Sequence, residues 1–407
     1  MPLAAVALAA LLLVAWRLAR HDEAPAAGPT VATTAAAGRT FFGTVEAAGL
    51  PLPDERARRR RELVDQLRFV DHTYCSYRKG SQYPAGSRPI AEHADQNTPN
   101  APVTEMNPMR LEGGGSDAKV QLQTSQSRVY MAANEAVAFS LRAVDAEGNV
   151  LPLAITRAQA RGITYGAARP APLVTLPFAD DGGGVDPVAN DGAWAGVLAP
   201  AQTGLAGFNG TIRTEVRYSV GGKNGSVIFD VIHTPELPAV WTGQVREALE
   251  NGSLNFYLKA DVRMPGRYLV SARVDDARGQ PFALLSFNDV LGPGPVEIKL
   301  SMFGKLMRDQ DAAQPLSLRD VDGYLLKENA DPDRALMPRL EGKVHTSKTY
   351  APGGFSDAEW QSEERSRYLT EFSKDVTLAR ERLAGFDPGQ PLPPSECAPG
   401  SPGQPAK

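Results

Sequence analysis

Hydrophobic and polar residues alternate along two long stretches of the chain, and a period of two predicts β-strands. The clearest example is the pair of runs 212–220 and 227–232, which the glycine-rich turn 221–225 joins. One face of such a hairpin is buried and the other lies in water. Similar runs begin at Lys119, so we expect a first β-sandwich over residues 117–234, the size of an immunoglobulin-like domain.

A proline-rich break at 234–238 ends this first series, because proline cannot donate a hydrogen bond to a sheet ladder. A second alternating series follows, with runs at 254–262, 268–274 and 282–287. We expect a second sandwich over residues 237–340. The predicted fold class is mainly β, with two tandem immunoglobulin-like β-sandwich domains.

A short helix is predicted at 54–70, where Leu63, Leu67 and Val70 recur at helical spacing behind two acidic residues. The arginine run 58–61 inside it is typical of a solvated helix face. Contact with anionic lipid headgroups is the alternative, since clustered basic residues are attracted to such a surface.

An amphipathic helix is predicted over residues 356–385. Ser356 and Glu359 form a capping-box pattern, and Gly385 ends the helix. Its apolar residues recur at spacings of three and four: Leu369, Phe372, Val376, Ala379 and Leu383. We expect this stripe to dock on a sandwich or on the 54–70 helix. The alternative is pairing with a second copy or a partner helix, which would make 356–385 a site of oligomerisation.

Two segments link these elements or end the chain. Residues 71–116 are rich in proline and glycine and complete a helix-plus-strap unit over 54–116. Aromatic side chains in this strap are candidate anchors on a neighbouring domain: Tyr74, Tyr77 and Tyr83. Residues 386–407 have the composition of a disordered tail.

The N-terminal residues 1–20 are apolar up to Trp16 and then basic, which predicts a membrane-anchor helix or a signal helix. Bulky and charged residues follow directly, so an uncleaved anchor is favoured, with residues 21–53 as a spacer. By the positive-inside rule, arginines behind the apolar run would leave the bulk of the chain in the cytoplasm. We expect the opposite orientation, because the spacer composition and the β-sandwiches are typical of cell envelopes. The predicted location is a single pass of the bacterial inner membrane, with the bulk in the periplasm or cell envelope.

The chain has two cysteines, Cys75 and Cys397. A disulfide between them would close a very long loop and would persist only in an oxidising compartment. Because Cys397 lies in a segment rich in proline and glycine, two unpaired thiols are the favoured interpretation. The disulfide is the alternative.

The densest turn sequence lies at residues 178–194, between two strand-like runs. Glycine allows a positive backbone φ, and aspartate side chains accept hydrogen bonds from nearby backbone N–H groups, so a structural turn is favoured. Calcium binding is the alternative, since Ca²⁺ takes about six to eight oxygen ligands. The candidate ligands are Asp180, Asp181, Asp186, Asn190 and Asp191.

Three segments carry a resemblance to a known family: Asp-Asp-Gly…Asp-Pro-Val-Ala-Asn-Asp-Gly at 180–192, Pro-Gly-Arg-Tyr-Leu-Val-Ser-Ala-Arg-Val-Asp-Asp at 265–276, and Pro-Phe-Ala-Leu-Leu-Ser-Phe-Asn-Asp at 281–289. Residues 118–340 resemble the bacterial envelope proteins with a choice-of-anchor X domain. The resemblance implies a tandem β-sandwich exoprotein that interchangeable anchors fix to the envelope. It implies no activity and no catalytic residues.

Composition and the sequence motifs that are missing argue against several functional classes. A formal net charge of −4 and scattered basic residues argue against a nucleic-acid partner. The five histidines are dispersed, and neither a His-Glu-x-x-His nor a Cys-x-x-Cys zinc motif is present. Gly-x-Ser-x-Gly and a phosphate-binding glycine loop are also missing from the sequence. We therefore expect a protein without enzymatic activity and without a cofactor.

The leading functional hypothesis is a membrane-anchored, non-catalytic envelope protein whose sandwiches act as spacer and as binding surface for a protein or glycan partner. The second is a structural subunit of an envelope assembly, which an exposed apolar stripe on the C-terminal helix would favour. The third is a carbohydrate-active enzyme or its accessory module, because sugars stack on exposed aromatic rings. The candidate rings on one sheet face are Tyr257, Tyr268 and Phe287.

Overall fold

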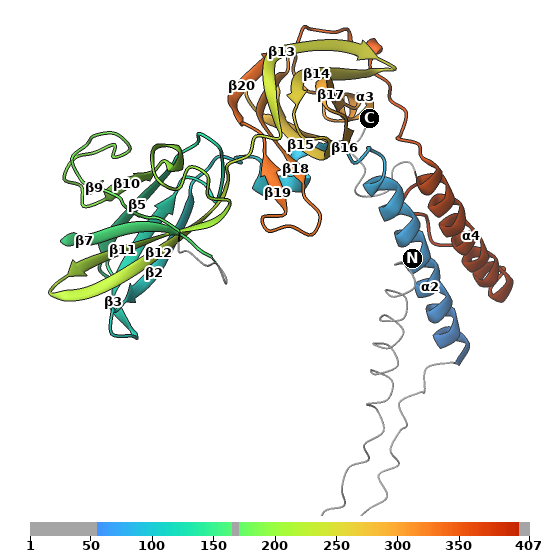
Figure 1. The fold of residues 1–407 in the computed structure, drawn as a ribbon. Coiled ribbons are helices and arrows are strands. Elements are labelled where there is room, and N and C mark those ends of the chain that lie inside the picture. Colours follow the sequence, from blue (N-terminus) through green and yellow to red (C-terminus); the bar gives the residue numbers. More distant parts are fainter. Residues whose placement is uncertain (1–54, 165–170, 399–407) are drawn as a thin grey trace, which may run out of the picture. The chain divides into compact units, whose positions relative to one another are not determined.

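The computed structural model describes residues 55–164 and 171–398 of the chain (Figure 1). This part is mainly β, as predicted, and its strands form several sheets in which antiparallel pairing prevails. The predicted anchor at 1–20 and spacer at 21–53 lie outside the described residues. Within the described ranges, no helix is long and apolar enough to cross a membrane.

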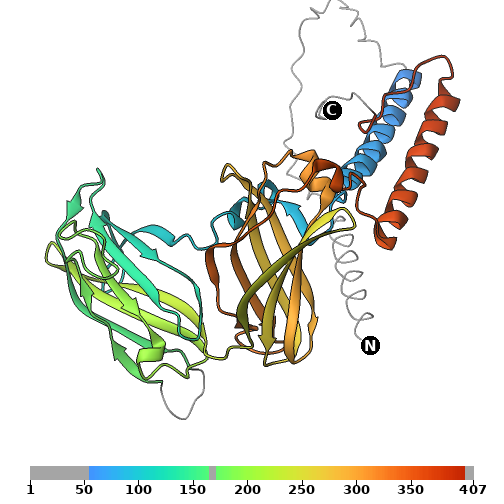
Figure 2. The same cartoon turned by 90° about the horizontal axis from the view of Figure 1, so that it is seen from above.

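The first group of strands makes two sheets that face each other across one core, and we call it the first sandwich (Figures 1 and 2). One sheet has the order β2-β3-β5-β10-β9 with β6 beside β5, and the other has the order β4-β12-β11-β7-β8. The bounds are β2 Val103–Arg110, β3 Ser116–Gln126, β4 Tyr130–Ala132, β5 Val137–Val144, β6 Val150–Leu151, β7 Leu153–Gly162, β8 Leu173–Thr175, β9 Phe178–Ala179, β10 Trp194–Leu198, β11 Gly210–Val220 and β12 Lys223–Thr234, with the 3₁₀ helix η2 at Pro200–Gln202. Phe139 from one sheet and Phe229 from the other meet in the core, with ring centroids 4.8 Å apart.

The β11–β12 hairpin shows why the sequence folds in this way. In β11 every second residue from Ile212 to Val220 is buried, and the residues between them are only half-buried. The turn consists of Gly221 and Gly222, with φ of 54° and 77°. Positive φ at both central positions is the requirement of a type I′ turn, whose twist matches that of the strands. The hairpin predicted from the alternating runs is therefore confirmed, but its turn has two residues, and the predicted turn residues 223–225 belong to β12.

The second sandwich has a sheet of order β1-β16-β15-β18-β19, with β20 beside β18, and a facing sheet of order β13-β14-β17 (Figure 2). The bounds are β1 Ser87–Pro89, β13 Ala239–Glu250, β14 Ser253–Val262, β15 Gly266–Asp275, β16 Pro281–Leu291, β17 Gly294–Met302, β18 Ser317–Leu326, β19 Arg334–Leu336 and β20 Leu340–Thr346, with helix α3 at Gly304–Asp309 and the 3₁₀ helix η3 at Pro352–Gly354. The sheet thus continues to Thr346, beyond the predicted end of the domain at residue 340.

The strap predicted as a polar connection at 71–116 contributes regular structure to both sandwiches. β1 pairs with β16, the 3₁₀ helix η1 Ile90–Gln96 follows, and β2 is an edge strand of the first sandwich. Tyr83 is buried in the second core, and its hydroxyl donates a hydrogen bond of 2.7 Å to Asp309. Sequence periodicity could not show this, because β1 has only three residues and β2 is exposed along most of its length.

Both predicted helices are present, but they begin and end at residues that differ from the predicted ones. Helix α2 spans Glu55–Gly80 and so extends ten residues beyond the predicted end at 70. Its second half looks polar because its inward positions are Asp71 and Cys75 and not aliphatic residues. Helix α4 spans Glu363–Phe386, and the predicted start at 356 is wrong.

The capping box predicted at Ser356 and Glu359 is also wrong. Ser362 is the N-cap, and its hydroxyl accepts a hydrogen bond of 3.1 Å from the backbone N–H of Arg365. Glu359 instead binds the guanidinium groups of Arg78 and Arg365. The acidic member of the predicted capping box is therefore engaged outside the helix, and the helix begins after the second serine, Ser362.

Helices α2 and α4 pack against each other through a small apolar core. Leu63 and Leu67 of α2 meet Ala379 and Leu383 of α4 in this core. At the other end, the Tyr77 ring lies 5.6 and 5.3 Å from the rings of Tyr368 and Phe372. The predicted docking of the C-terminal stripe on the 54–70 helix is therefore confirmed.

Candidate functional site

The aspartate-rich loop joins β9 to β10 in the first sandwich. Carboxylate oxygens of Asp180, Asp186 and Asp191 lie within 4.8 Å of one another, and Asp181 is not part of this group of carboxylates. Asn190 adopts a positive φ of 58°, which asparagine tolerates better than most residues. Three of the five candidate ligands thus come together.

Backbone N–H groups already occupy the oxygens of these carboxylates. Asp180 accepts from the N–H groups of Asp191 and Gly192, at 3.2 and 3.0 Å. Asp186 is buried and accepts from Gly182 at 2.7 Å and from Val188 at 3.3 Å. These bonds are those of side-chain-capped turns, and they fix the loop without an ion. Calcium binding remains a prediction, with Asp180, Asp186 and Asp191 as the ligands that geometry favours.

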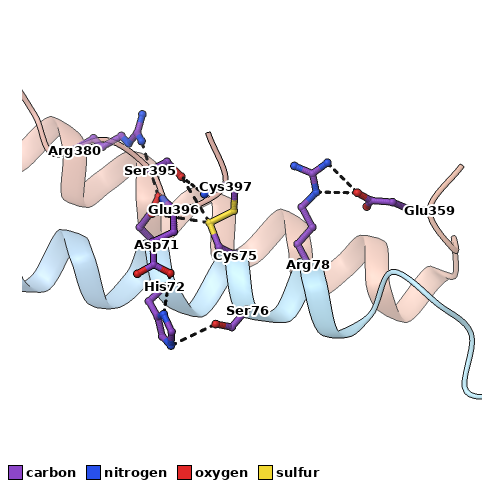
Figure 3. Close-up of a disulfide and its surroundings, with 10 residues drawn as sticks. All are labelled: Asp71, His72, Cys75, Ser76, Arg78, Glu359, Arg380, Ser395, Glu396 and Cys397. Atoms are coloured by element: carbon purple, nitrogen blue, oxygen red, sulfur yellow. Dashed lines mark hydrogen bonds and ion pairs between the residues drawn. A yellow bond between two sulfur atoms is a disulfide. The ribbon is translucent and has the colours of Figure 1, made fainter. Parts of the chain in front are cut away.

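The two cysteines form a disulfide between α2 and the C-terminal tail (Figure 3). Cys75 and Cys397 have Cα atoms 5.5 Å apart and are separated by 322 residues in the sequence. Their Cα distance is in the usual range for a disulfide. The interpretation of two unpaired thiols, favoured from the sequence, does not describe this structure.

Polar contacts around the disulfide hold the tail against α2. Asp71 is buried, and its carboxylate accepts a hydrogen bond of 2.7 Å from the backbone N–H of Glu396. The Glu396 carboxylate in turn lies 2.9 Å from Nδ1 of His72 (Figure 3). Leu392 packs on the apolar core of the two helices. The predicted disordered tail at 386–407 is therefore wrong for residues 386–398, since Phe386 ends α4 and the segment after it is attached to α2; residues 399–407 lie outside the described residues.

The aromatic rings proposed for stacking on sugars do not form a row. Tyr257 lies on β14, while Tyr268 and Phe287 lie on strands of the facing sheet. Tyr268 is completely buried, and its hydroxyl donates to the carbonyl oxygens of Pro238 and Met264. The guanidinium of Arg246 covers the ring of Tyr257 at 3.7 Å from the centroid. This arrangement removes ring stacking as an argument for carbohydrate binding.

One buried cluster that sequence reasoning missed fixes the strap to the second sandwich. Arg273 of β15 is 1% exposed and donates to the backbone and side-chain oxygens of Gln96, to the carbonyl of Asp320 and to Asp322. Arg319 of β18 pairs with Asp275 at 2.7 Å. These strand positions alternate with core residues and so look solvent-exposed in the sequence. Gln96 and Asn97 of the strap contact these arginines, so that Arg273 is buried and Arg319 is half-buried.

Glu247, like Glu396 beside His72, is a carboxylate within hydrogen-bond distance of a histidine. Its two oxygens lie 2.9 Å from Nε2 of His345 and 2.9 Å from the Tyr350 hydroxyl, and the backbone N–H of Lys348 donates at 2.7 Å. Burial raises the pKa of Glu247, but these hydrogen bonds outweigh burial and the net pKa is lowered. An ionised carboxylate with every oxygen engaged ties β20 and the segment behind it to β13, which is a structural role.

Comparison with known proteins adds little to this geometry. No family model matches the chain, and no curated protein matches it. Among solved structures, it is similar to a DUF4785 family protein from Legionella pneumophila subsp. pneumophila str. Philadelphia 1, with 12% identity and a TM-score of 0.37 over 55% of this chain and 57% of that one. It is also similar to the adhesin InvE of Yersinia pseudotuberculosis, with 11% identity and a TM-score of 0.16 over 53% and 58% of the two chains. The chain thus spans little more than half of each protein, and at these scores neither likeness carries an argument about fold or function.

Proposed function

We propose that this chain is a non-catalytic protein of the bacterial cell envelope, tethered to the inner membrane by residues 1–20, with its β-sandwiches outside the cytoplasm. The sandwiches act there as spacer and as binding surface. The disulfide between Cys75 and Cys397 is the observation that carries this proposal. Disulfides form and persist in oxidising compartments such as the periplasm, whereas cytoplasmic thiols are kept reduced.

The strand order supports the same proposal. Antiparallel sheets of order β3-β5-β10-β9 and β4-β12-β11-β7-β8, with β4 parallel to β12, correspond to an immunoglobulin-like sandwich with a split first strand. The sheets β13-β14-β17 and β16-β15-β18-β20 of the second sandwich follow a similar order. We infer that both domains are immunoglobulin-like, in keeping with the resemblance to choice-of-anchor X proteins. Such sandwiches are common in cell-surface proteins.

An assembly role through the C-terminal helix finds less support. The C-terminal part of its apolar stripe, Val376, Ala379 and Leu383, packs on α2, so these residues are already covered within the chain. A glycan or protein partner is better sought on the sandwiches.

Reporter fusions test the proposed orientation. Alkaline phosphatase folds into an active enzyme only where its disulfides form, and a green fluorescent protein exported by the general secretory route stays dark. Each reporter is fused after Lys407 of the full chain. We expect phosphatase activity without fluorescence, and a matched chain without residues 1–20 should reverse both readings. Fluorescence without phosphatase activity from the full chain would refute the proposal and support the positive-inside orientation.

A further inference from the structure

The outer face of the β8-β7-β11-β12 sheet carries an unusual arrangement of arginines. Two strands in its middle, β7 and β11, are paired antiparallel, and their outward residues oppose one another in three cross-strand pairs: Arg161 with Arg213, Gln159 with Glu215, and Arg157 with Arg217. Together with Leu173 of β8, these six side chains line a groove of about 330 Å³. Two arginine–arginine pairs thus flank one central polar pair.

Like charges directly opposite on neighbouring strands are destabilising. The β11 members of both pairs have acidic partners that offset this cost. Arg213 makes a bidentate pair with Asp230 at 2.8 and 2.7 Å. Arg217 pairs with Glu215 at 2.8 Å and with Glu112 at 2.6 Å. The sandwich therefore supplies counter-charges on the β11 side of the groove.

The β7 side of the groove has no such compensation. Arg157 and Arg161 are exposed, and no acidic side chain among the described residues lies within ion-pair distance of either guanidinium. They are four residues apart on one strand face, which separates them by about 13 Å at the rise of a β-strand. Along its β7 side, the groove therefore presents two guanidinium groups, each available to an anion and set apart by the strand geometry.

We propose that this groove binds a linear anionic polysaccharide, with Arg157 and Arg161 each pairing with a carboxylate of the polymer. A planar guanidinium matches a carboxylate in bidentate geometry, which gives position as well as attraction. Between the two arginines, the Gln159 amide donates to sugar hydroxyls and the Glu215 carboxylate accepts from them. This recognition relies on charge and hydroxyl groups and needs no aromatic platform.

The sheet geometry favours a polysaccharide over an acidic peptide. β11 is paired with a strand on each side, and β8 pairs with β7 over Gln159–Arg161, so the backbone in the middle of the groove is already engaged in the sheet, whereas β7 before Gln159 has β11 as its one neighbour among the described strands. A peptide lying across this face would leave its own backbone polar groups without ladder partners, whereas peptides that join a sheet do so at an edge. A polysaccharide has no such requirement.

The inference rests on the proposed role of the sandwiches as binding surfaces, and its test is independent of location. The purified full-length chain in detergent is titrated with polygalacturonate, with neutral dextran and poly-L-glutamate as comparison ligands, and binding is measured by isothermal calorimetry. Wild type should bind polygalacturonate and not dextran. The variant Arg157→Gln/Arg161→Gln should weaken this binding at least tenfold.

A matched variant separates a specific site from general charge attraction. Arg263→Gln/Arg267→Gln removes two exposed arginines from the second sandwich and lowers the net charge equally. It should change the affinity for polygalacturonate less than twofold. The inference is overturned if polygalacturonate does not bind, if both variants lose affinity equally, or if poly-L-glutamate binds as tightly. Any of these results leaves the envelope proposal standing, since that proposal rests on the disulfide.

Discussion

At the scale of single residues, buried polar groups fix the two sandwiches by satisfying backbone atoms. His233 on β12 is 2% exposed, and its Nδ1–H donates a hydrogen bond of 2.7 Å to the carbonyl oxygen of Phe208. Burial lowers the pKa of His233, although the Phe208 carbonyl and the charge of Glu135 act in the opposite direction. The folded chain therefore holds this imidazole neutral.

This lowered pKa predicts that the first sandwich loses stability in mild acid. As the pH falls, the unfolded chain binds the proton first, near the ordinary histidine pKa of about 6.5, so stability is present above that pH and is lost below it. The loss from one such group is at most about 1.4 kcal/mol per pH unit. Urea unfolding of the full chain at pH 7.5 and pH 5.5 measures it. In His233→Asn, which keeps an N–H donor without a titrating ring, the pH dependence should be smaller, and an unchanged dependence would contradict this account.

At this scale, the sequence predicted the roles of residues with local contacts but not those of residues with distant contacts. Asp180 and Asp186 could be identified because turn chemistry is local and a few residues of sequence reveal it. Arg273 could not, because its role depends on Gln96, which lies far away in the sequence. The pairing of Cys75 with Cys397 was likewise available only as one of two alternatives. Local sequence patterns do not show contacts between residues that lie far apart in the sequence.

At the scale of elements, the strands were predicted better than the helix ends. The alternation in β11 and β12 is strong because each strand has one buried face and one face that is at most half-buried or exposed. Helix α2 was predicted too short because its second half packs through Asp71, Cys75 and Tyr77 on α4 and the tail. The start of α4 was missed because two nearby serines both resemble caps.

The observed cap makes a prediction that separates those two serines. Ser362→Ala removes the acceptor for the Arg365 N–H and should destabilise the first turn of α4 by about 1 kcal/mol. Ser356→Ala is the matched control, since Ser356 accepts from the Ala358 N–H in the segment before the helix. Hydrogen exchange at residues 363–366 should therefore speed up in the first variant and stay unchanged in the second. The reverse pattern would restore the start predicted from the sequence.

At the scale of the whole molecule, the disulfide defines a closed chain. It connects the helix that follows the predicted anchor and spacer to the C-terminal tail, across a sequence separation of 322 residues that includes both sandwiches. In the chain-entropy model, closing so long a loop lowers the conformational entropy of the unfolded chain. This raises the free energy of unfolding by several kcal/mol. The covalent link also keeps the tail on α2, where Asp71 and His72 contact Glu396. This construction is useful only in a compartment that keeps the link oxidised.

The state of the two thiols in living cells is the most direct test of that claim. Cells making the full chain are quenched with acid, and the denatured chain is treated with a maleimide carrying polyethylene glycol, with or without prior reduction. The account predicts no modification without reductant and two additions after reduction. Cys75→Ser should leave one thiol that reacts without reductant, which calibrates the shift on a gel. Two additions to the wild-type chain without reductant would contradict the disulfide, and with it the placement of the sandwiches outside the cytoplasm.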